Sequence, residues 1–593
     1  MMKLNCGELR ESHIGSEVEL QGWSRYRRDH GGKLFIDIAD RYGTTQLVFE
    51  GDVKRIAEGI GREYVIHASG KARKRDDDTV DTTNPTGSVE IYVALLEVIS
   101  ASKVPPFEII EEKKKFLANE DLRLRYRYLD LRRQEMIKRV EFRDRFMKIA
   151  RKFFWENGFL ELETPTLVKD TYETGSRTFL VPSRTNQGKF YSLPQSPQVY
   201  KQLCMVSGLD RYFQIARCYR DEDPREDRQP EFTQIDLELS FIDERYIKEL
   251  IERFLQKLVK ELTGKELKTP FRSMGYEHAM KSYGSDKPDL RFDSRIADIT
   301  EDLKSTEYNI IKRVIESNGK VKAMSFRAGY GSADARLDKN YMIKSIEYAK
   351  TLGLKGLTWL YVESNAVKSE PQSIADSLGE AKKAIRRKTG AEDGDIIIVC
   401  SDTSEKVLLD AMGKLRKAIG DRIDQYNSDY EFLWVEGFPL FERDEVTGRL
   451  KPTHNPFTSP TPESIGMMDK EPERMMSRQY DLVLNGTELG SGSIRINDPE
   501  LQRKALRLMG MSDESIERSF GFLLEALGYG APVHGGIALG VDRLVALLYR
   551  SGEMRDFILF PKNKKYESPL DGSPTPIDKK RLREDFGIDQ EKL

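Results

Sequence analysis

The first hundred residues alternate between apolar and polar positions in short runs. This period of two is typical of half-buried strands, and clusters of Gly, Asp and Asn separate the runs, which cover residues 17–23, 34–38, 45–50, 64–71 and 88–100. Five short strands in so short a stretch predict a small Greek-key barrel such as an OB-fold.

The apolar period becomes helical from residue 141 onward. Apolar side chains there recur on one face of the expected helix: Phe142, Phe146, Ile149, Ala150, Phe153 and Phe154. Gly158 can end this helix in a left-handed conformation. Residues 159–164 (FLELET) then alternate as a strand before Pro165, and residues 211–241 predict two antiparallel strands around a charged loop.

Residues 288–424 differ in pattern from the sequence on either side of them. A helix is expected near residues 337–352 and a buried strand at 395–400, after which Ser401 or Asp402 could cap another helix. A helix-and-strand mixture inside one contiguous segment predicts a separate α+β insertion.

Residues 104–135 separate the expected barrel from the rest of the chain. Pro105 and Pro106 interrupt regular structure, and residues 123–133 (RLRYRYLDLRR) are dense in Arg and Tyr. That segment is either a solvated linker helix or a hinge that also contacts an anionic partner, and the sequence leaves both interpretations open.

The charge balance limits the class of protein. The 593 residues include 96 Lys and Arg against 98 Asp and Glu, which excludes a uniformly basic nucleic-acid coat but allows a local basic face. No apolar run is long enough to span a membrane, no signal peptide precedes the barrel, and the four cysteines form no CxxC pair. No P-loop signature is present. We therefore expect a cytoplasmic protein.

The charged segment 220–234 (RDEDPREDRQPEFTQ) is the first candidate for chemistry. Arg220 stands at the end of a strand, and an Arg fork suits bidentate binding of phosphate or carboxylate. Asp236 and Glu238 recur two positions apart on the returning strand, so they face the same side of the sheet. Buried carboxylates need a cationic partner, which an ammonium group or a metal ion would supply.

Two further segments carry candidate ligands. In residues 481–495, Asp481 and Glu488 could share a Mg²⁺ ion, beside small residues that let a ligand approach the backbone. The same pattern also suits a Gly-rich hairpin without a ligand. In residues 535–548, Arg543 lies near the start of an apolar helix, where it could pair with a carboxylate or bind a terminal phosphate.

These segments together resemble the three motifs of class II aminoacyl-tRNA synthetases. Residues 159–165 are similar to motif 1, residues 220–231 to motif 2 and residues 535–543 to motif 3. Longer segments spread over nearly the whole chain resemble bacterial-type aspartyl-tRNA synthetases: YRYLDLRR, LPQSPQVYKQ, CYRDED, DRQPEFTQID, YGSDKPDLR, NPFTSP and GVDRL.

The resemblance implies an α+β multidomain fold. It implies an OB-fold anticodon-binding domain (1–103), a hinge (104–135), an antiparallel-sheet catalytic domain in two parts (136–287 and 425–561), a bacterial-type α+β insertion domain (288–424) and a C-terminal extension (562–593). Motif 1, with Pro165, would lie at a homodimer interface.

The resemblance also implies a reaction with ATP as substrate and Mg²⁺ as cofactor. Aspartate would be joined to AMP and then passed to the 3′ end of tRNA(Asp). Arg220 would bind the α-phosphate and the substrate carboxylate, Arg543 the γ-phosphate, and Asp481 and Glu488 the Mg²⁺. Arg220, Glu222 and Arg543 would be the catalytic residues, and the ATP site would comprise Arg220, Asp221, Glu222, Arg228, Gln229, Glu488, Gly540, Val541, Asp542 and Arg543.

For aspartate, the resemblance implies fixed cations around the side-chain carboxylate and acceptors around the ammonium group. Lys201 and Arg495 match the cation positions, and Gln198 and Asp236 the acceptor positions; Thr174, Arg220 and His454 complete the set.

Two positions depart from the family. Residues 173–177 read ETGSR, which puts Thr174 where a Glu is expected, with Glu173 one residue away. Asn455 follows His454 where the family has paired histidines, which weakens the cationic surroundings of the carboxylate.

On the tRNA side, residues 25–33 (RYRRDHGGK) are expected as a basic and aromatic loop between barrel strands. Arg28, Phe35 and Gln46 match family positions that contact the anticodon. His30, followed by two glycines, is similar to the subgroup that also charges tRNA(Asn), so relaxed tRNA use is expected. The alternatives are a strictly tRNA(Asp)-specific ligase, a sister enzyme for asparagine or lysine, and a non-catalytic tRNA-binding paralogue, which would be expected to lack Arg220 or Arg543.

Overall fold

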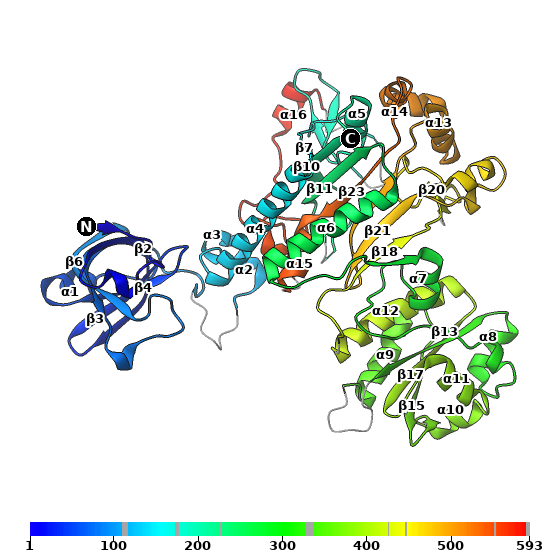
Figure 1. Cartoon of the computed structure of the whole chain (residues 1–593), viewed down its shortest axis with the longest axis horizontal. Helices are drawn as coiled ribbons and strands as arrows, with labels where there is room; N and C mark the ends of the chain where they lie inside the picture. The colour runs from blue at the N-terminus through cyan, green and yellow to red at the C-terminus, as the bar shows by residue number, and fades with distance from the viewer. Residues whose placement is uncertain are drawn as a thin grey trace.

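The structure is a computed structural model, and it describes residues 1–109, 117–171, 177–225, 228–327, 336–424, 426–444, 447–550 and 553–588. The structure has three bodies built around separate sheets, and the third is inserted between two segments of the central body (Figure 1). None of the helices within those ranges is long and apolar enough to cross a membrane.

The N-terminal body is a closed barrel, as predicted for an OB-fold. Its strands are β2 (Glu17–His30), β3 (Lys33–Ala39), β4 (Thr44–Phe49), β5 (Val65–Lys74) and β6 (Val89–Ser100), with α1 (Gly51–Ala57) between β4 and β5. The sheet runs β2-β3-β4-β6-β5, and the β2–β5 pairing closes it. A short β1 (Met2–Lys3) adds to β2 in parallel. Alternating side chains such as Leu34, Ile36 and Ile38 fill the interior.

The expected loop at residues 25–33 is instead strand. β2 continues to His30, and Gly31 and Gly32 alone form the turn into β3, with φ of 59° and 79°. A two-residue turn with positive φ at both positions matches the twist of the flanking strands, and Gly adopts it without steric cost. The basic side chains of this segment therefore stand on a strand that β3 holds in register.

The segment between the barrel and the second body contains α2 (Glu120–Arg125) and α3 (Arg127–Asp130). The Asp130 carboxylate is fully buried and accepts hydrogen bonds from Arg127 Nη1 at 2.6 Å and Arg133 Nη1 at 2.8 Å. The expectation of a solvated helix is therefore wrong at these two arginines, because a buried carboxylate needs cationic partners of its own.

The central body is an eight-stranded sheet in the order β12-β18-β21-β22-β23-β11-β10-β7. Its strands are β7 (Leu160–Glu161), β10 (Arg211–Tyr219), β11 (Glu231–Ser240), β12 (Arg272–Gly275), β18 (Phe432–Glu436), β21 (Gln479–Leu484), β22 (Thr487–Ile494) and β23 (His534–Gly540). All neighbours pair antiparallel except β7 with β10 and β12 with β18. The strand predicted at residues 159–164 is only two residues long.

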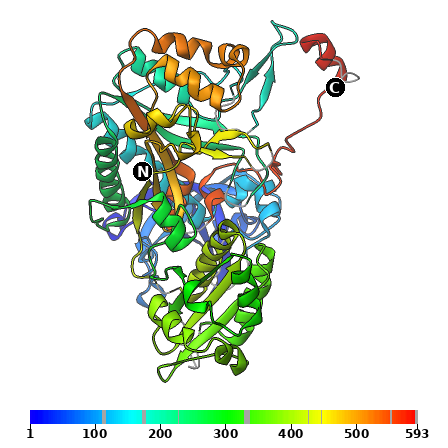
Figure 2. The same cartoon turned by 90° about the vertical axis from the view of Figure 1, so that its right-hand side faces the viewer.

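Helices α4 (Gln134–Glu156), α6 (Glu244–Thr263) and α15 (Val541–Tyr549) cover one face of this sheet. The apolar stripe of α4 packs there, and Gly158 follows the helix with φ of 78°, as predicted. The opposite face carries α5 (Gln198–Val206) and a large cavity. Helices α13 (Pro499–Leu508) and α14 (Asp513–Leu527) lie at the end of the molecule remote from the third body (Figures 1 and 2).

The third body lies within the segment expected as an insertion. Its antiparallel sheet runs β13 (Ala297–Asp298), β14 (Lys320–Arg327), β17 (Asp395–Asp402), β15 (Thr358–Glu363) and β16 (Ala366–Lys368). Around it lie α8 (Asn309–Glu316), α9 (Lys339–Thr351), α10 (Gln372–Ser377), α11 (Ala381–Thr389) and α12 (Glu405–Ile423). The cap expected at Ser401 or Asp402 is wrong, because β17 includes both residues; the Ser404 hydroxyl accepts from Val407 N–H instead.

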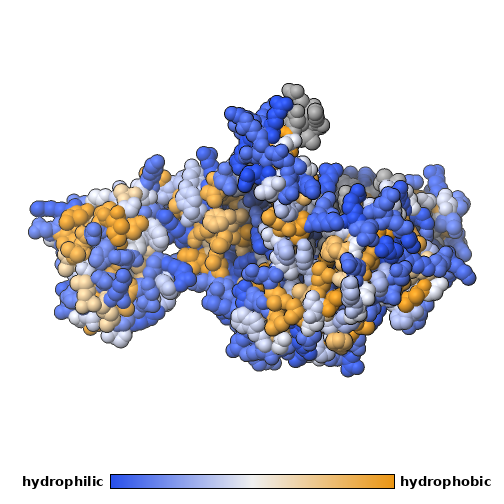
Figure 3. All heavy atoms as spheres, turned by 90° about the horizontal axis from the view of Figure 1, so that it is seen from above, coloured by the Kyte–Doolittle hydropathy of each residue, from blue (hydrophilic) through white to orange (hydrophobic). Residues whose placement is uncertain are grey.

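The C-terminal segment ends in α16 (Lys579–Phe586), which projects from the central body beside the hairpin of β8 (Leu180–Pro182) and β9 (Phe190–Ser192) (Figure 2). Gln187 Nε2 in that hairpin donates to the Glu584 carbonyl at 3.1 Å. Figure 3 shows this projection covered mainly by hydrophilic side chains, and the barrel as a separate body with hydrophobic patches of its own.

Candidate active site

A cavity of about 880 Å³ opens on the face of the central sheet that α4, α6 and α15 do not cover. Its walls come from α5, from the loop between β10 and β11, from β11, β22 and β23, and from the start of α15. Nine cationic and five acidic side chains line it. The excess of positive charge suits a polyanionic ligand.

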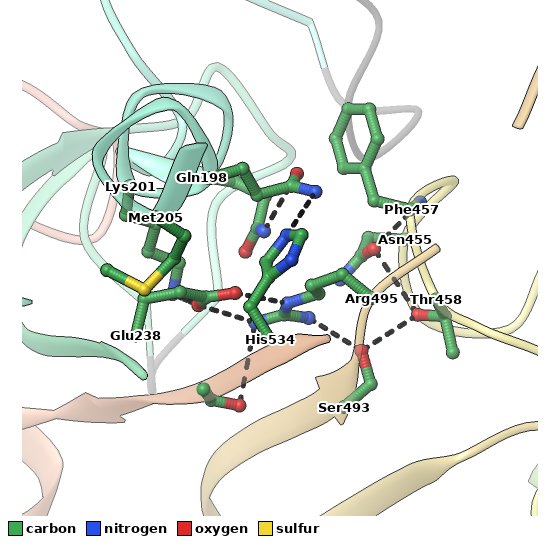
Figure 4. Close-up of polar contacts among 12 residues, drawn as sticks. Gln198, Lys201, Met205, Glu238, Asn455, Phe457, Thr458, Ser493, Arg495 and His534 are labelled. Atoms are coloured by element: carbon green, nitrogen blue, oxygen red, sulfur yellow. Dashed lines mark hydrogen bonds and ion pairs between the residues drawn. The ribbon is translucent and has the colours of Figure 1, made fainter. Parts of the chain in front are cut away.

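The four charged side chains of Lys201, Asp236, Glu238 and Arg495 form the inner end of this site, and Figure 4 shows Lys201, Glu238 and Arg495. Lys201 Nζ lies 3.1 Å from Asp236 Oδ1 and 3.3 Å from Glu238 Oε2. Arg495 Nε donates to Glu238 Oε1 at 2.9 Å and Arg495 Nη2 to Glu238 Oε2 at 3.2 Å. All four side chains are 1% exposed or less, so their charges act on one another with little screening by water.

Local structure explains why these four residues meet. Asp236 and Glu238 alternate with Leu237 and Leu239 along β11, so the leucines enter the core while both carboxylates face the cavity. Gln198, Lys201, Gln202 and Met205 share the buried face of α5 at helical spacing. Arg495 directly follows β22. Gly536 pairs with Glu238 in the neighbouring strand, where an added Cβ would lie 2.3 Å from Glu238 Oε2.

The two carboxylates differ in what they can still bind. Burial would raise the pKa of Glu238, but Arg495 and Lys201 outweigh that effect and hold it below its usual value. Burial raises the pKa of Asp236 despite the nearby Lys201. Asp236 Oδ2 is buried and has no hydrogen-bond partner. An unpaired buried carboxylate oxygen is costly, so this atom marks the place for a cationic group of a ligand.

His454 and Asn455 lie beside this cluster. Burial, followed by the positive charges of Arg495 and Lys201, lowers the pKa of His454 to about 3, so its imidazole is neutral at physiological pH. Asn455 Oδ1 accepts from Phe457 N–H at 3.0 Å, and Thr458 Oγ1 lies 3.2 Å from Ser493 Oγ. Asn455 therefore holds the turn of its own loop and adds no charge to the site.

Arg220 stands at the end of β10, beside the inner cluster. Its guanidinium lies 5.2 Å from the ring centre of Phe232, and its buried Nε has no hydrogen-bond partner. Among the neighbouring predicted residues, Glu222 pairs with Arg228, and Asp221 N–H donates to the carbonyl of Arg177. Arg220 is thus placed to bind an anion, while Glu222 positions Arg228.

The residues expected around the nucleotide divide into two groups. Gln229 exchanges hydrogen bonds with the backbone of Lys562 at 3.1 and 2.9 Å, and Asp542 accepts from Arg143 and from the Thr233 N–H. Val541 is buried in the core. These contacts hold the side chains of Gln229 and Asp542 in place at the cavity wall. Gly540, Glu488 and Arg543 line the same cavity.

Asp481 and Glu488 lie on adjacent strands β21 and β22. Burial, followed by the negative charge of Glu488, raises the pKa of Asp481 to about 8. A divalent cation would relieve this repulsion, so the pair fits Mg²⁺. In the described part of the chain, no group of three or more His, Cys, Asp or Glu is arranged to hold a metal. Two protein carboxylates would therefore share the ion with phosphate oxygens and water. Arg543 Nη1 donates to the Glu488 carbonyl at 2.7 Å.

Several residues of this site were not predicted as ligands. Glu238 was recognised only as facing the same side as Asp236, because the sequence does not show that Arg495 reaches it. Buried His534 and Gln202 lie 3.3 Å apart between β23 and α5, and nothing in their local sequence marks them. The predicted Thr174 and its neighbour Glu173 lie outside the described residues.

The predicted anticodon residues lie along one side of the barrel. Arg28 Nη2 donates to Asp37 Oδ1 and Gln46 Oε1, both at 3.0 Å, and Phe35 pairs with Arg28 across β2 and β3. His30 is exposed at the start of the turn into β3. Tyr92 was not predicted, although Arg73 lies 4.0 Å from the centre of its half-buried ring; an accessible aromatic ring among cations is typical of a base-stacking surface.

Comparison with known families gives two matches. The family described as "tRNA synthetases class II (D, K and N)" matches residues 119–564, and the family described as "OB-fold nucleic acid binding domain" matches residues 18–99. The first match covers the central sheet together with the third body, and the second covers the barrel.

Relatives match almost the full length. The chain is 42% identical over 584 residues to the Aspartate--tRNA(Asp/Asn) ligase of Caldanaerobacter subterraneus, which covers 98% of this chain and 97% of the relative. It is 44% identical over 588 residues to the Aspartate--tRNA ligase of Bacillus licheniformis, with the same coverage. A crystal structure of asparaginyl-tRNA synthetase from Pyrococcus horikoshii with asparaginyl-adenylate covers 95% of this chain and 98% of its own at a TM-score of 0.59, with 18% identity, which supports the fold alone.

Proposed function

Because the chain belongs to the class II tRNA synthetases of the D, K and N group, we propose that it activates L-aspartate with ATP and transfers the aspartyl group to the 3′ end of tRNA(Asp) and tRNA(Asn). Members of this family are ligases that charge tRNA at the expense of ATP, and this chain is one of them. The choice of amino acid and of tRNA is the proposal.

The charge of the inner site is the observation that carries the choice of aspartate. Among the described residues of the inner site, Lys201, Arg220 and Arg495 are positive, Asp236 and Glu238 are negative, and His454 is neutral, which leaves one positive charge in excess. Aspartate has one ammonium and two carboxylate groups, so it neutralises this excess. Asparagine has no net charge and would leave a buried cation without a partner, which is costly.

The same geometry orients the substrate. The ammonium group lies at Asp236 Oδ2, the side-chain carboxylate at Lys201 and Arg495, and the α-carboxylate at Arg220. From there one α-carboxylate oxygen attacks the α-phosphorus of ATP, and the bond to the bridging oxygen of the β-phosphate breaks. Arg220 stabilises the charge that develops at the α-phosphate, so catalysis is positioning and electrostatic stabilisation rather than proton transfer.

Asp481 and Glu488 hold Mg²⁺ in this proposal, and the ion supplies charge neutralisation to the phosphates when bound. The aspartyl group then passes from the adenylate to a terminal ribose hydroxyl of tRNA, with AMP as the leaving group. Arg28, His30, Phe35 and Gln46 on the barrel bind the anticodon.

Two further parts of the proposal concern the assembly and its location. Trp155, Leu160 and Leu167 are each about half exposed around the motif 1 segment, and Pro165 lies between them in the chain. Apolar exposure of this kind suits a homodimer interface. The enzyme would act in the cytoplasm, where its tRNA substrates are.

Charging assays test the proposal. Aspartate is incubated with ATP and with transcripts of tRNA(Asp) and tRNA(Asn) in parallel, at one salt concentration, because phosphate contacts weaken with salt. We expect both transcripts to be charged. Charging of tRNA(Asp) alone would mean a strictly specific ligase, and charging of neither transcript would contradict the proposal.

A further inference from the structure

One wall of the active-site cavity comes from outside the central sheet. Lys287 belongs to the linker that follows α7 (Tyr276–Tyr283), and Lys417 belongs to helix α12 of the third body, yet both line the cavity. Lys287 Nζ lies 3.8 Å from Glu488 Oε2. The third body is therefore not remote from the site.

Helix α12 packs on this linker through a face made of small residues. An added Cβ at Gly413 would lie 2.1 Å from the Gly284 carbonyl oxygen, and one at Gly420 would lie 2.3 Å from the Phe292 ring. Positions 413, 417 and 420 fall on one face of a helix, so Lys417 points to the linker side. The glycines let the helix approach closely enough for Lys417 to reach the cavity.

The linker in turn lies on the hairpin that carries Glu488. An added Cβ at Gly486, in the turn between β21 and β22, would lie 2.9 Å from Asp289 Cβ. Glu488 follows two residues later and faces the cavity. These close approaches connect α12, the linker and the β21–β22 hairpin in that order, and the two lysines carried by α12 and the linker both line the cavity.

We propose that Lys417 and Lys287 bind the β- and γ-phosphates of ATP and then the pyrophosphate that leaves. The inner cations Lys201 and Arg495 are occupied by Glu238 and the substrate carboxylate, so they do not serve the phosphates. The two lysine side chains hold the negative charge of pyrophosphate after the bond to the α-phosphorus breaks. The third body thereby contributes a phosphate-binding residue to the site. This inference rests on the proposed function.

The helix provides a matched control for Lys417. Lys417 Nζ lies 3.0 Å from Asp421 Oδ2, and Lys414 Nζ lies 2.7 Å from Asp410 Oδ2. Both pairs have i,i+4 spacing, and the two lysines are 51% and 52% exposed. Only Lys417 lines the cavity. The variants Lys417→Gln and Lys414→Gln therefore remove the same charge and the same kind of surface ion pair.

Calorimetric titration of the full-length variants with Mg–ATP and with AMP tests the proposal. We expect Lys417→Gln and Lys287→Gln to weaken ATP binding about three- to tenfold and to leave AMP binding unchanged, because AMP lacks the β- and γ-phosphates. The KM for pyrophosphate in aspartate-dependent exchange should rise by the same factor. Lys414→Gln should match the wild type in every measurement.

Equal ATP affinity in Lys417→Gln and Lys414→Gln would overturn the inference. So would an equal loss of ATP and AMP affinity, which would place Lys417 at the nucleoside. If the wild type shows no aspartate-dependent exchange, the proposed amino-acid substrate fails, but the comparison of ATP with AMP still decides the role of Lys417. Unchanged unfolding midpoints would show that each variant folds.

Discussion

Lys201 Nζ lies 3.1 Å from Asp236 Oδ1, while Oδ2 of the same buried carboxylate has no hydrogen-bond partner. One oxygen is thus fixed by the protein and the other is left for a ligand. Glu238, two residues along β11, is saturated by Arg495 and Lys201 and has no such free position. In the described part of the site, Asp236 Oδ2 is thus available to an ammonium group, and Lys201 and Arg495 to a carboxylate.

The substitution Asp236→Asn should lower kcat/KM for aspartate by about two to three orders of magnitude, because the substrate ammonium loses its buried carboxylate partner. Affinity for ATP, measured by titration, should be unchanged. Stability is measured alongside, because buried Lys201 loses one of its two carboxylate partners in this variant.

Glu231→Gln serves as the control for this substitution. Glu231 stands at the other end of β11 and pairs with Arg217 at the surface. Equal losses of aspartate activity in the two variants would contradict the assignment of Asp236 to the ammonium group.

Removal of the Arg495 guanidinium should destabilise the fold. In Arg495→Met, buried Glu238 retains only Lys201, and we expect a loss of about 3 kcal/mol in the free energy of unfolding. The double variant Glu238→Gln/Arg495→Met should recover at least about 1 kcal/mol of the lost free energy of unfolding, because it also removes the negative charge of Glu238 that Arg495 no longer pairs. Urea denaturation measures the free energy of unfolding of the single and the double variant. An unchanged midpoint in Arg495→Met would show that the pair does not stabilise the protein.

His454 should make the stability depend on pH in acid. Its pKa is about 3 in the folded protein and 6.5 in the unfolded chain, so the unfolded state binds the proton first. The contribution of neutral His454 to the free energy of unfolding is complete above about pH 6.5 and is lost progressively as the pH falls toward 3. We expect His454→Gln to flatten the fall in unfolding free energy between pH 6.5 and 4.

The exposed His278→Gln variant is the control for this pH series. It should follow the wild-type profile throughout. If His454→Gln also followed that profile, the imidazole would titrate normally, and its charge would have to be added to the cations around the substrate carboxylate.

The turn at His30 should affect the choice of tRNA. His30 is exposed where β2 turns into β3 through Gly31 and Gly32, close in the hairpin to Arg28 and Phe35, which we propose bind the anticodon. We expect His30→Leu to lower charging of tRNA(Asn) relative to tRNA(Asp) by at least about fivefold, since one lost polar contact costs about 1 kcal/mol. His13→Leu, on the same barrel but outside this turn, should leave the ratio unchanged. An unaltered ratio in His30→Leu would remove His30 from tRNA selection.

Local pattern was sufficient for most of the secondary structure. The alternation in the barrel and on β10 and β11 located those strands, because one face of each is buried and period two is then unambiguous. It was insufficient at residues 27–30, where exposed polar residues continue β2 without an apolar face. It was also insufficient at residues 159–164, where only two residues pair with a neighbouring strand.

Tertiary contacts explain the rest. Arg127 and Arg133 look like surface residues in the sequence, and only the fold shows that Asp130 binds both. The pairing of Arg495 with Glu238 joins residues 257 positions apart. Lys417 lines the cavity because α12 packs on the linker, and no sequence pattern within α12 predicts that contact.

The central claim is that one excess positive charge in the inner site selects aspartate. Pyrophosphate exchange into ATP, measured with aspartate and with asparagine on the same enzyme preparation, tests it most directly. The account predicts kcat/KM for aspartate about four orders of magnitude above that for asparagine, as for sites that leave buried polar groups unpaired with the wrong substrate. Comparable values for the two amino acids, or a preference for asparagine, would contradict it.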